Sequence, residues 1–258
     1  MIELDKISFA YEKTPVLTDV SLNVQESEML GIIGPNSSGK STLLKIMAGI
    51  LKPDKGVVEI EGNDIKSLLR RETAKSVSFV PQETPASFPF TVMETVLLGR
   101  TPHLASLAFE SEEDLDMARK SLESTDTLDL QERFFEELSG GEKQLVTIAR
   151  ALAQDAPVML FDEPTTFLDI RHQIQIFEVI TRLNRESRRT VVVVSHDLNI
   201  ASLYCSRLVL LREGRIAIDG PPEEVIKSHL LKETYGVDMR IISALDKSFV
   251  LPERLQES

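Results

Sequence analysis

The sequence predicts a doubly wound α/β fold. Three mainly apolar runs, at residues 77–80, 158–161 and 191–194, are typical of strands that are covered on both faces in a parallel sheet; only the first contains a polar residue, Ser78. Helical patterns accompany these runs, with apolar residues spaced i, i+3, i+4 and i+7 in residues 145–152 and 176–183. Strands that alternate with helices along a chain favour a sheet with helices on its faces.

The amino-terminal part of the chain has a different pattern. Apolar residues alternate with polar ones around residues 2–4, 20–24 and 57–60, and turn-forming residues separate these stretches. Alternation with a period of two is typical of strands that bury only one face. We therefore expect half-buried antiparallel strands close to the loop that follows residue 33.

A glycine-rich loop at residues 34–42 reads G-P-N-S-S-G-K-S-T. It matches the phosphate-cradling pattern of glycine, four residues, glycine, lysine, and serine or threonine. An apolar run at residues 29–33 precedes the loop and a helical apolar face at residues 43–47 follows it, so the context is strand, loop and helix. The loop consists of Gly34, Pro35, Asn36, Ser37, Ser38, Gly39, Lys40, Ser41 and Thr42.

This loop suits a bound triphosphate. Glycines let backbone N–H groups close around phosphate oxygens, and the N-terminus of a helix adds partial positive charge and unpaired donors. We expect Lys40 to reach the terminal phosphates and the Ser41 hydroxyl to bind Mg²⁺. The alternative, a glycine-rich turn that only starts a helix, competes weakly with this interpretation.

The middle of the chain interrupts the alternation of strands and helices. Residues 83–153 contain a proline-rich loop and then mainly helical periodicity, without a good strand candidate, which predicts an inserted helical subdomain. Further on, apolar residues 208–211 and 216–218 flank a turn and predict a hairpin. A short helix is expected over residues 223–228, and a mixed tail with little chemical signal follows it.

Composition and charge exclude several classes of protein. The net charge of −12 argues against nucleic acid as a partner, because duplex binding needs clustered cations. We interpret the arginines of residues 182–189 as the exposed end of a helix, and the acidic residues 110–116 as a solvated helix start. The amino terminus lacks the features of a secretory signal, and the apolar runs are only strand-length, so no membrane crossing is expected. Cys205 is expected to be a buried or idle thiol, which suits a reducing cytosol.

Two consecutive carboxylates, Asp162 and Glu163, end the apolar run at residues 158–161. The carboxyl ends of parallel strands are where an open α/β sheet binds its ligand. Asp162 suits a direct or water-mediated hold on Mg²⁺, and Glu163 can point at a water molecule in line with the γ-phosphate. The alternative interpretation is an acidic strand end that only precedes a turn. The presence of Lys40 and Ser41 in the same chain favours the catalytic interpretation of the pair.

A second helix start follows Leu138. Ser139 is a plausible N-cap, and Gly140 and Gly141 come directly after it. Two adjacent glycines cost conformational entropy unless the backbone must approach something closely. We therefore interpret this helix start as a second anion site, which indicates a paired arrangement of two chains, because one nucleotide does not easily need two such cradles from one chain.

With these motifs the chain resembles the ATP-binding cassette (ABC) ATPases, and the resemblance covers nearly all of it. It implies a P-loop NTPase fold with a RecA-like core, an antiparallel β subdomain and an inserted α-helical subdomain. Residues 138–142 resemble the family's signature sequence, and Asp162 and Glu163 its magnesium and general-base pair. The implied single domain has its nucleotide-binding core in residues 1–82 and 154–235, its helical signature subdomain in residues 83–153 and a tail in residues 236–258.

Three single residues fall where that family places them. Gln82 resembles the glutamine that senses Mg²⁺ and the attacking water, His196 the switch histidine that contacts the γ-phosphate, and Tyr11 the aromatic residue on which adenine stacks. Leu168 and Asp169 resemble the loop that communicates across the dimer. The chain departs from the family's usual pattern at Ser37, Leu145 and Phe167, and no catalytic group is lost there.

The resemblance also points to a branch of the family. The sequence Gly-Arg-Thr-Pro-His at residues 99–103 and the tail around residues 235–238 are similar to importers of iron-siderophores, haem and cobalamin. The resemblance to these importers also implies a groove, formed with Phe88, Phe90 and Val92, that receives a coupling helix of a membrane permease. His103 is expected to be a loop histidine rather than a metal ligand, because no second ligand lies at chelating spacing.

The leading hypothesis is the ATP-hydrolysing subunit of a metal-chelate importer. It implies ATP and Mg²⁺ as ligands, a homodimer on nucleotide binding, integral-membrane permease subunits, an extracytoplasmic substrate-binding protein and a peripheral location at the cytoplasmic face of the inner membrane. A second hypothesis couples the same ATPase to export, lipoprotein release or a soluble assembly. A third, a P-loop kinase that phosphorylates a small molecule, is disfavoured by Ser139–Gly141 and Glu163.

Overall fold

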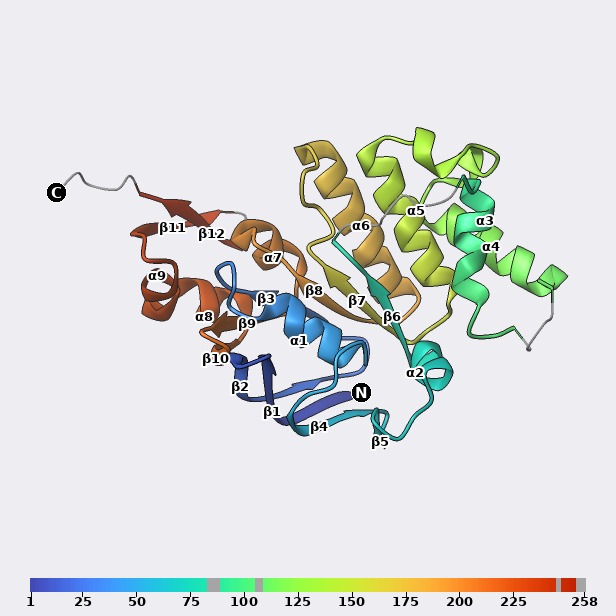
Figure 1. The fold of residues 1–258 in the computed structure, drawn as a ribbon. Helices are drawn as coiled ribbons and strands as arrows, with labels where there is room; N and C mark the ends of the chain where they lie inside the picture. Colours follow the sequence, from blue (N-terminus) through green and yellow to red (C-terminus); the bar gives the residue numbers. More distant parts are fainter. Residues whose placement is uncertain (83–88, 105–108, 245–246, 254–258) are drawn as a thin grey trace. The chain divides into compact units, whose positions relative to one another are not determined.

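The computed structural model describes residues 1–82, 89–104, 109–244 and 247–253. The chain divides into two compact units (Figure 1): unit 1 comprises residues 1–67 and 190–258, and unit 2 comprises residues 68–189.

Unit 1 contains most of the strands. Its strands are β1 (Ile2–Tyr11), β2 (Thr14–Val24), β3 (Met29–Ile33), β4 (Lys55–Ile60), β5 (Asn63–Asp64), β8 (Thr190–Val194), β9 (Arg207–Arg212), β10 (Arg215–Gly220), β11 (Met239–Ala244) and β12 (Lys247–Pro252). Its helices are α1 (Lys40–Met47), α7 (Leu198–Tyr204), α8 (Pro222–Lys227) and α9 (His229–Tyr235).

Two sets of strands in unit 1 follow the predicted division. Strands β2, β1, β4 and β5 form an antiparallel sheet in that order, which confirms the half-buried amino-terminal strands. Strand β3 pairs in parallel with both β8 and β9, and β9 forms an antiparallel hairpin with β10. All five residues of β3 and of β8 are buried, as expected of strands covered on both faces.

Unit 2 holds the inserted helices. It contains α2 (Arg70–Ser76), β6 (Val77–Val80), α3 (Val92–Leu97), α4 (Glu112–Ser124), α5 (Gly140–Ala153), β7 (Val158–Asp162) and α6 (Ile170–Glu186), with short 3₁₀ turns at Leu98–Arg100, Leu128–Leu130 and Phe135–Glu137. Strands β6 and β7 are parallel, with Val80 opposite Phe161. Helices α3, α4 and α5 lie together (Figure 1) around a core that includes Val96, Leu122 and Val146. The helical character expected of this segment is confirmed.

The acidic residues 110–116 correct one expectation. Ser111 caps α4, as a solvated helix start would predict, but Asp114 is only 7% exposed. Its Oδ1 accepts a hydrogen bond from Arg100 Nε at 2.8 Å, and Arg100 Nη1 also donates to the Ala153 carbonyl. The helix start is therefore partly buried, because the Arg100 guanidinium pairs with the buried Asp114 carboxylate.

The arginines near the end of α6 are also less free than the sequence indicates. Arg182 donates to the Ser124 carbonyl and to Asp126, and Arg189 donates to the Ala156 carbonyl and to Asp155. These bonds connect the end of α6 to neighbouring loops, so Arg182 and Arg189 have structural partners.

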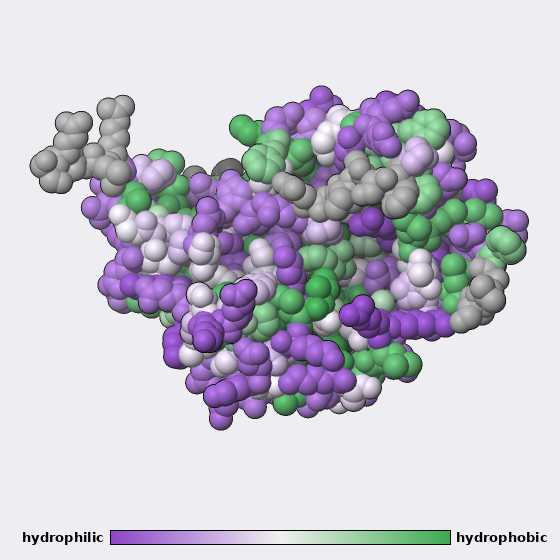
Figure 2. All heavy atoms as spheres, viewed as in Figure 1, coloured by the Kyte–Doolittle hydropathy of each residue, from purple (hydrophilic) through white to green (hydrophobic). Residues whose placement is uncertain are grey.

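The carboxyl-terminal tail contains a hairpin that was not predicted from the sequence. Strands β11 and β12 form an antiparallel hairpin, and the side-chain amide of Asn199 on α7 exchanges two hydrogen bonds with the backbone of Val250. Cys205 is buried, and burial raises the pKa of its thiol to about 12, which confirms an inert thiol. None of the described helices has the length and apolarity that a membrane span requires. Hydrophilic residues cover most of the face in Figure 2, in keeping with the net charge of −12.

Candidate functional site

The glycine-rich loop connects β3 to α1 in unit 1. Gly34 has a φ of 150°, and a Cβ there would lie 2.2 Å from the Leu211 carbonyl oxygen, so only glycine fits. Gly39, at a φ of 102°, is the N-cap of α1 and provides no side-chain cap. The first backbone N–H groups of α1 therefore face the loop without a side-chain acceptor, which is the arrangement that binds anions.

Polar groups of the loop point into this cradle. Lys40 is only 5% exposed. Its Nζ donates hydrogen bonds to the carbonyl oxygens of Gly34 at 2.9 Å and of Pro35 at 3.0 Å, and these bonds hold the cation inside the loop. The Ser38 hydroxyl is buried and has no hydrogen-bond partner within the described residues. A buried polar group without a partner is costly, so a phosphate oxygen is a fitting acceptor here.

The edge of unit 1 that holds this loop also carries His196. Because β3 and β8 are parallel and Ile32 pairs with Val194, the segments that follow both strands lie at the same edge. His196 is exposed between β8 and α7, and Asp197 caps α7 by accepting hydrogen bonds from the N–H groups of Asn199 and Ile200. His196 is thus placed beside the loop by the strand pairing and by a well-capped helix.

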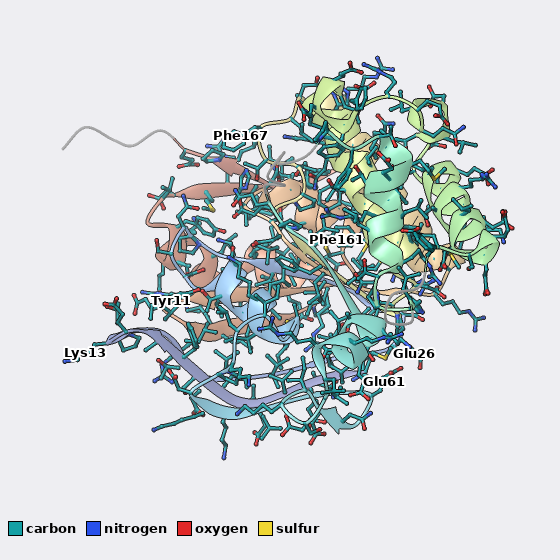
Figure 3. All side chains as sticks on the ribbon, turned by 45° about the vertical axis from the view of Figure 1, so that its right-hand side comes forward. Tyr11, Lys13, Glu26, Glu61, Phe161 and Phe167 are labelled. Carbon is teal, nitrogen blue, oxygen red and sulfur yellow. The ribbon has the colours of Figure 1, made fainter. Side chains whose placement is uncertain are left out.

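Tyr11 ends β1 at the hairpin with β2 (Figure 3). Tyr11 is 48% exposed, and its ring packs edge-to-face against Phe9, with ring centroids 4.9 Å apart. An exposed aromatic ring whose orientation is fixed by a neighbour offers a stacking surface for a base.

Gln82 and Glu163 meet at the carboxyl edge of the β6–β7 pair in unit 2. Gln82 Nε2 donates to Glu163 Oε2 at 3.1 Å, and the Thr166 hydroxyl donates to the same oxygen at 3.2 Å. Asp162, the last residue of β7, is 4% exposed. The two positions chosen from the sequence are therefore in direct contact, and Thr166 is an additional partner that sequence reasoning missed.

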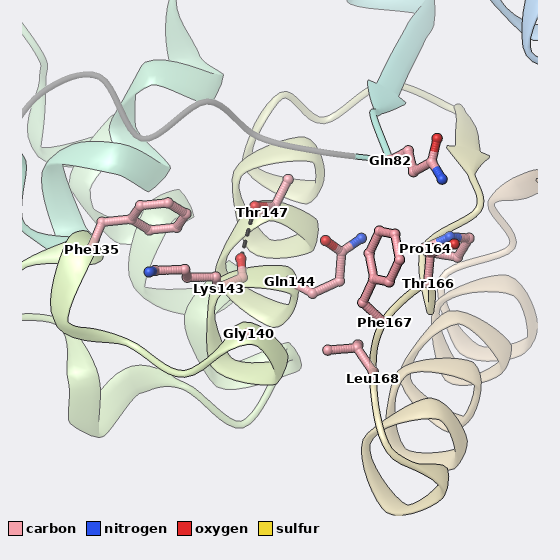
Figure 4. Close-up of a pocket in the computed structure, with 10 residues that line it drawn as sticks. All are labelled: Gln82, Phe135, Gly140, Lys143, Gln144, Thr147, Pro164, Thr166, Phe167 and Leu168. Carbon is pink, nitrogen blue, oxygen red and sulfur yellow. Dashed lines mark hydrogen bonds between the residues drawn. The ribbon is translucent and has the colours of Figure 1, made fainter.

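A pocket of about 330 Å³ opens beside this pair (Figure 4). Gln82 lines it together with residues of α5 and of the segment after β7, among them Gln144, Thr166 and Phe167. Phe167 is 88% exposed and has a φ of 64°, a left-handed conformation that is uncommon for a bulky residue. The departure noted in the sequence at position 167 thus places an exposed aromatic ring on this segment.

Ser139 caps α5 as predicted. Its hydroxyl accepts a hydrogen bond from the Glu142 N–H, and Glu142 Oε2 accepts one from the Ser139 N–H at 2.8 Å, which completes a capping box. The hydrogen bonds from the Ser139 side chain and backbone lower the pKa of Glu142. The helix start is therefore rigid, and its tip, Ser139 and Gly140, is exposed.

The two glycines at the start of α5 differ, because Gly140 is exposed and Gly141 is buried. A Cβ on Gly141 would lie 2.3 Å from Cδ2 of His172, and a Cβ on Gly140 would lie 3.4 Å from Leu168. The close approach that the sequence indicated at Gly141 is thus made by a histidine of the same unit. His172 is a residue that sequence reasoning missed, and its only signal was the unexplained glycine at position 141.

The donor set is suited to Mg²⁺. The three residues chosen from the sequence, Ser41, Gln82 and Asp162, carry a hydroxyl, an amide oxygen and a carboxylate, which are hard oxygen donors of the kind that Mg²⁺ prefers. The described residues contain no cluster of three or more His, Cys, Asp or Glu side chains suited to a metal ion.

Two other expectations concern unit 2. His103 lies in a turn, and its Nε2 is 2.9 Å from the Gln154 carbonyl oxygen. In the expected permease groove, Val92 is buried and Phe90 is half-buried, whereas Phe88 lies outside the described residues.

The sequence profile of the ABC transporter family matches residues 17–166, which is more than half of the chain. Among curated proteins, the petrobactin import ATP-binding protein FpuC of Bacillus anthracis is 35% identical over 100% of this chain and 94% of its own length. The ferric enterobactin transport ATP-binding protein FepC of Escherichia coli K12 is 36% identical over 92% of this chain and 88% of its own length.

Solved structures agree with the sequence comparisons. An inward-facing ABC transporter assigned to the metal-chelate type has a TM-score of 0.86 at 26% identity, and covers 98% of this chain and 97% of its own. A dimeric ATP-binding cassette in a post-hydrolysis state, bound to ADP and Pi, has a TM-score of 0.76 at 32% identity, and covers 86% of this chain and 99% of its own.

The phosphate loop with its buried lysine, the contact between Gln82 and Glu163 and the capped glycine tip of α5 are therefore found in a chain that these proteins match along nearly its whole length. The chain belongs to the ABC transporter family and is an ATP-binding, ATP-hydrolysing subunit.

Proposed function

We propose that this ATPase powers the uptake of a metal chelate of the iron-siderophore, haem or cobalamin type. The observation that carries the proposal is the full-length similarity to ATP-binding proteins of petrobactin and ferric enterobactin import, together with a metal-chelate type transporter among the structural neighbours. The chain works with integral-membrane permease subunits and, through them, with an extracytoplasmic substrate-binding protein. It lies peripherally at the cytoplasmic face of the inner membrane.

The proposed mechanism uses two copies of the chain. Each of two ATP molecules is held by Tyr11, Lys40 and Ser41 of one copy and by the tip Ser139–Gly141 of the other. The domain division follows the same roles, with a nucleotide-binding core in residues 1–82 and 154–235, a helical signature subdomain in residues 83–153 and a tail in residues 236–258.

Mg²⁺, held by Ser41, Gln82 and Asp162, would neutralise charge on the β- and γ-phosphates. Glu163 orients the attacking water and takes its proton, since general bases must lie within hydrogen-bond reach of the water and Gln82 already holds the Glu163 carboxylate in place. Lys40 and His196 stabilise the charge of the transferred phosphoryl group. Hydrolysis removes the contacts that bridge the two copies and reopens the dimer.

Reconstitution with the cognate permease tests this function. ATP hydrolysis by the complex in proteoliposomes should rise when a substrate-binding protein delivers the right chelate, and should stay low with the metal-free ligand. Iron-siderophore complexes, haem and cobalamin are compared in parallel. The same permease assembly with the Glu163→Gln substitution serves as the control without hydrolysis. Stimulation by none of them, in a permease complex that is otherwise active, contradicts metal-chelate uptake and favours coupling to another task.

A further inference from the structure

His172 lies in the first turn of α6, directly after the loop of Phe167, Leu168 and Asp169. Asp169 caps α6 by accepting a hydrogen bond from the His172 N–H at 2.9 Å. Both carboxylate oxygens of Asp169 also lie 2.9 Å from His172 Nδ1. Because an ionised carboxylate only accepts hydrogen bonds, Nδ1 carries a proton and donates it. The imidazole is thereby fixed in one orientation.

The other edge of the ring faces the tip of α5. An added Cβ on Gly141 would lie 2.3 Å from His172 Cδ2, 2.8 Å from Cγ and 3.0 Å from Nε2. Gly141 is not among the residues with positive φ, so its backbone conformation does not require glycine. It is the space taken by the His172 ring that excludes a side chain at position 141.

The charge of His172 also acts on the capping box of α5. The pKa of Glu142 is lowered mainly by its hydrogen bonds with Ser139, and the nearby Arg133 and His172 lower it further. The pKa of Asp169 is lowered by its hydrogen bonds with His172. One imidazole therefore contacts Asp169 of the loop on one side and Gly141 of the tip on the other.

We propose that His172 is a positioning residue that holds the loop Phe167–Asp169 and the tip Ser139–Gly141 in one fixed relation. The inference rests on the proposed function, in which this tip binds the ATP of the partner copy. His172 touches no phosphate. It sets the position of the tip through Gly141, so that any shift of the loop on nucleotide binding moves the tip by the same step.

Two substitutions separate the contacts of the ring. His172→Phe keeps the ring against Gly141 and loses the hydrogen bond to Asp169, whereas His172→Asn keeps a donor for Asp169 and loses the far edge of the ring. Both substitutions are made in a Glu163→Gln parent, and each should weaken ATP-driven dimerisation about tenfold. This is the effect expected from losing either one hydrogen bond to a charged group or the packing of part of the ring. His229→Phe, the same change at an exposed histidine of unit 1, serves as control.

The readout is sedimentation equilibrium with ATP, compared with the ATP affinity of the monomer and with the melting temperature. The inference expects weaker dimerisation at unchanged monomer affinity. Equal dimerisation of parent and both variants overturns the inference and leaves the proposed function standing. A parent that does not dimerise with ATP overturns the proposed function, and the inference with it.

A double mutant tests the contact itself. Gly141→Ala should lower the melting temperature because its methyl group collides with the His172 ring, and His172→Ala should remove part of that loss by opening the space. Strictly additive effects of the two changes would mean that the ring is not what excludes a side chain at position 141, and would overturn the inference whatever the dimerisation result.

Discussion

At the scale of single residues, Glu163 has a strained backbone conformation and a side chain that is held by two hydrogen bonds. Its φ is 48°, and a left-handed conformation costs a residue with a Cβ about 1–2 kcal/mol. The hydrogen bonds from Gln82 and Thr166 both reach the same carboxylate oxygen, Oε2. The backbone strain is thus tolerated where the two bonds hold the carboxylate at the carboxyl edge of β6 and β7.

Glu163→Gln should abolish turnover while preserving the fold. The amide has the shape of the carboxylate but takes no proton, so ATP hydrolysis should fall by about two to four orders of magnitude, the usual worth of a general base. ATP affinity should be retained. Phosphate release at saturating ATP measures the change, with Glu186→Gln at the exposed end of α6 as control. Hydrolysis at the rate of the parent protein would reject Glu163 as the base.

Tyr11 should contribute to nucleotide affinity through its ring alone. Removing a stacking partner costs about 1–3 kcal/mol, so Tyr11→Ala should weaken ATP binding by roughly 5-fold to 150-fold. Tyr11→Phe keeps the ring and its packing against Phe9, and should bind as the parent does. Titration with a fluorescent ATP analogue measures both. If Tyr11→Ala binds with the parent's affinity, adenine does not stack at this position.

At the scale of elements, the pair Arg100–Asp114 fastens α4 to the end of α5. Both side chains are less than a tenth exposed, and Arg100 reaches the Ala153 carbonyl as well. A hydrogen bond from the Ser111 backbone, and next the bond from Arg100, lower the pKa of Asp114 to about 2. The Gly-Arg-Thr-Pro-His segment therefore has a structural task inside unit 2, and Gly99 lies too close to the Arg150 carbonyl to accept a side chain.

Asp114→Asn should destabilise the protein by about 3 kcal/mol, because it leaves a buried arginine without its counter-charge. The folded-state pKa lies below the unfolded one, so the stabilisation is present above about pH 4 and is lost as the pH falls towards 2. Chemical denaturation at pH 7 and near pH 3 should show a smaller difference from the parent at the lower pH. Asp116→Asn, whose pair with Arg119 is exposed, should cost less than about 1 kcal/mol. Equal effects of both changes would contradict this account.

Local signals in the sequence identified most of the elements, and contacts between distant residues account for what it missed. The phosphate loop, the strand ends at Asp162 and Glu163 and the N-cap at Ser139 are each written in a few consecutive residues. By contrast, Asp114 is buried because Arg100 reaches it, and β12 is ordered partly through Asn199 on α7. Patterns along the chain do not report such partners.

At the scale of the whole molecule, the account requires two copies. Ser139 and Gly140 at the capped start of α5 are exposed, and related cassettes have been solved as dimers. The proposed roles of Ser139, Gly140 and Gly141 concern the ATP of the partner, so their loss should affect association rather than binding to one copy.

Ser139→Phe should block closure of the dimer. The ring would fill the space of a phosphate at the tip of α5, while the phosphate loop in the other unit is unchanged. ATP hydrolysis should therefore be lost at unchanged monomer affinity for ATP. Calorimetric titration of the monomer, beside sedimentation with ATP, separates the two steps. A fall in monomer affinity with normal dimerisation would mean that Ser139 acts on the ATP of its own chain.

The most direct test is a structure of the Glu163→Gln protein crystallised with ATP and Mg²⁺. The account predicts two copies with two nucleotides between them, and the Ser139 hydroxyl and Gly141 N–H of each copy within hydrogen-bonding distance of the partner's γ-phosphate. A structure with ATP bound and with Ser139 and Gly141 remote from every phosphate, in both copies, would contradict it.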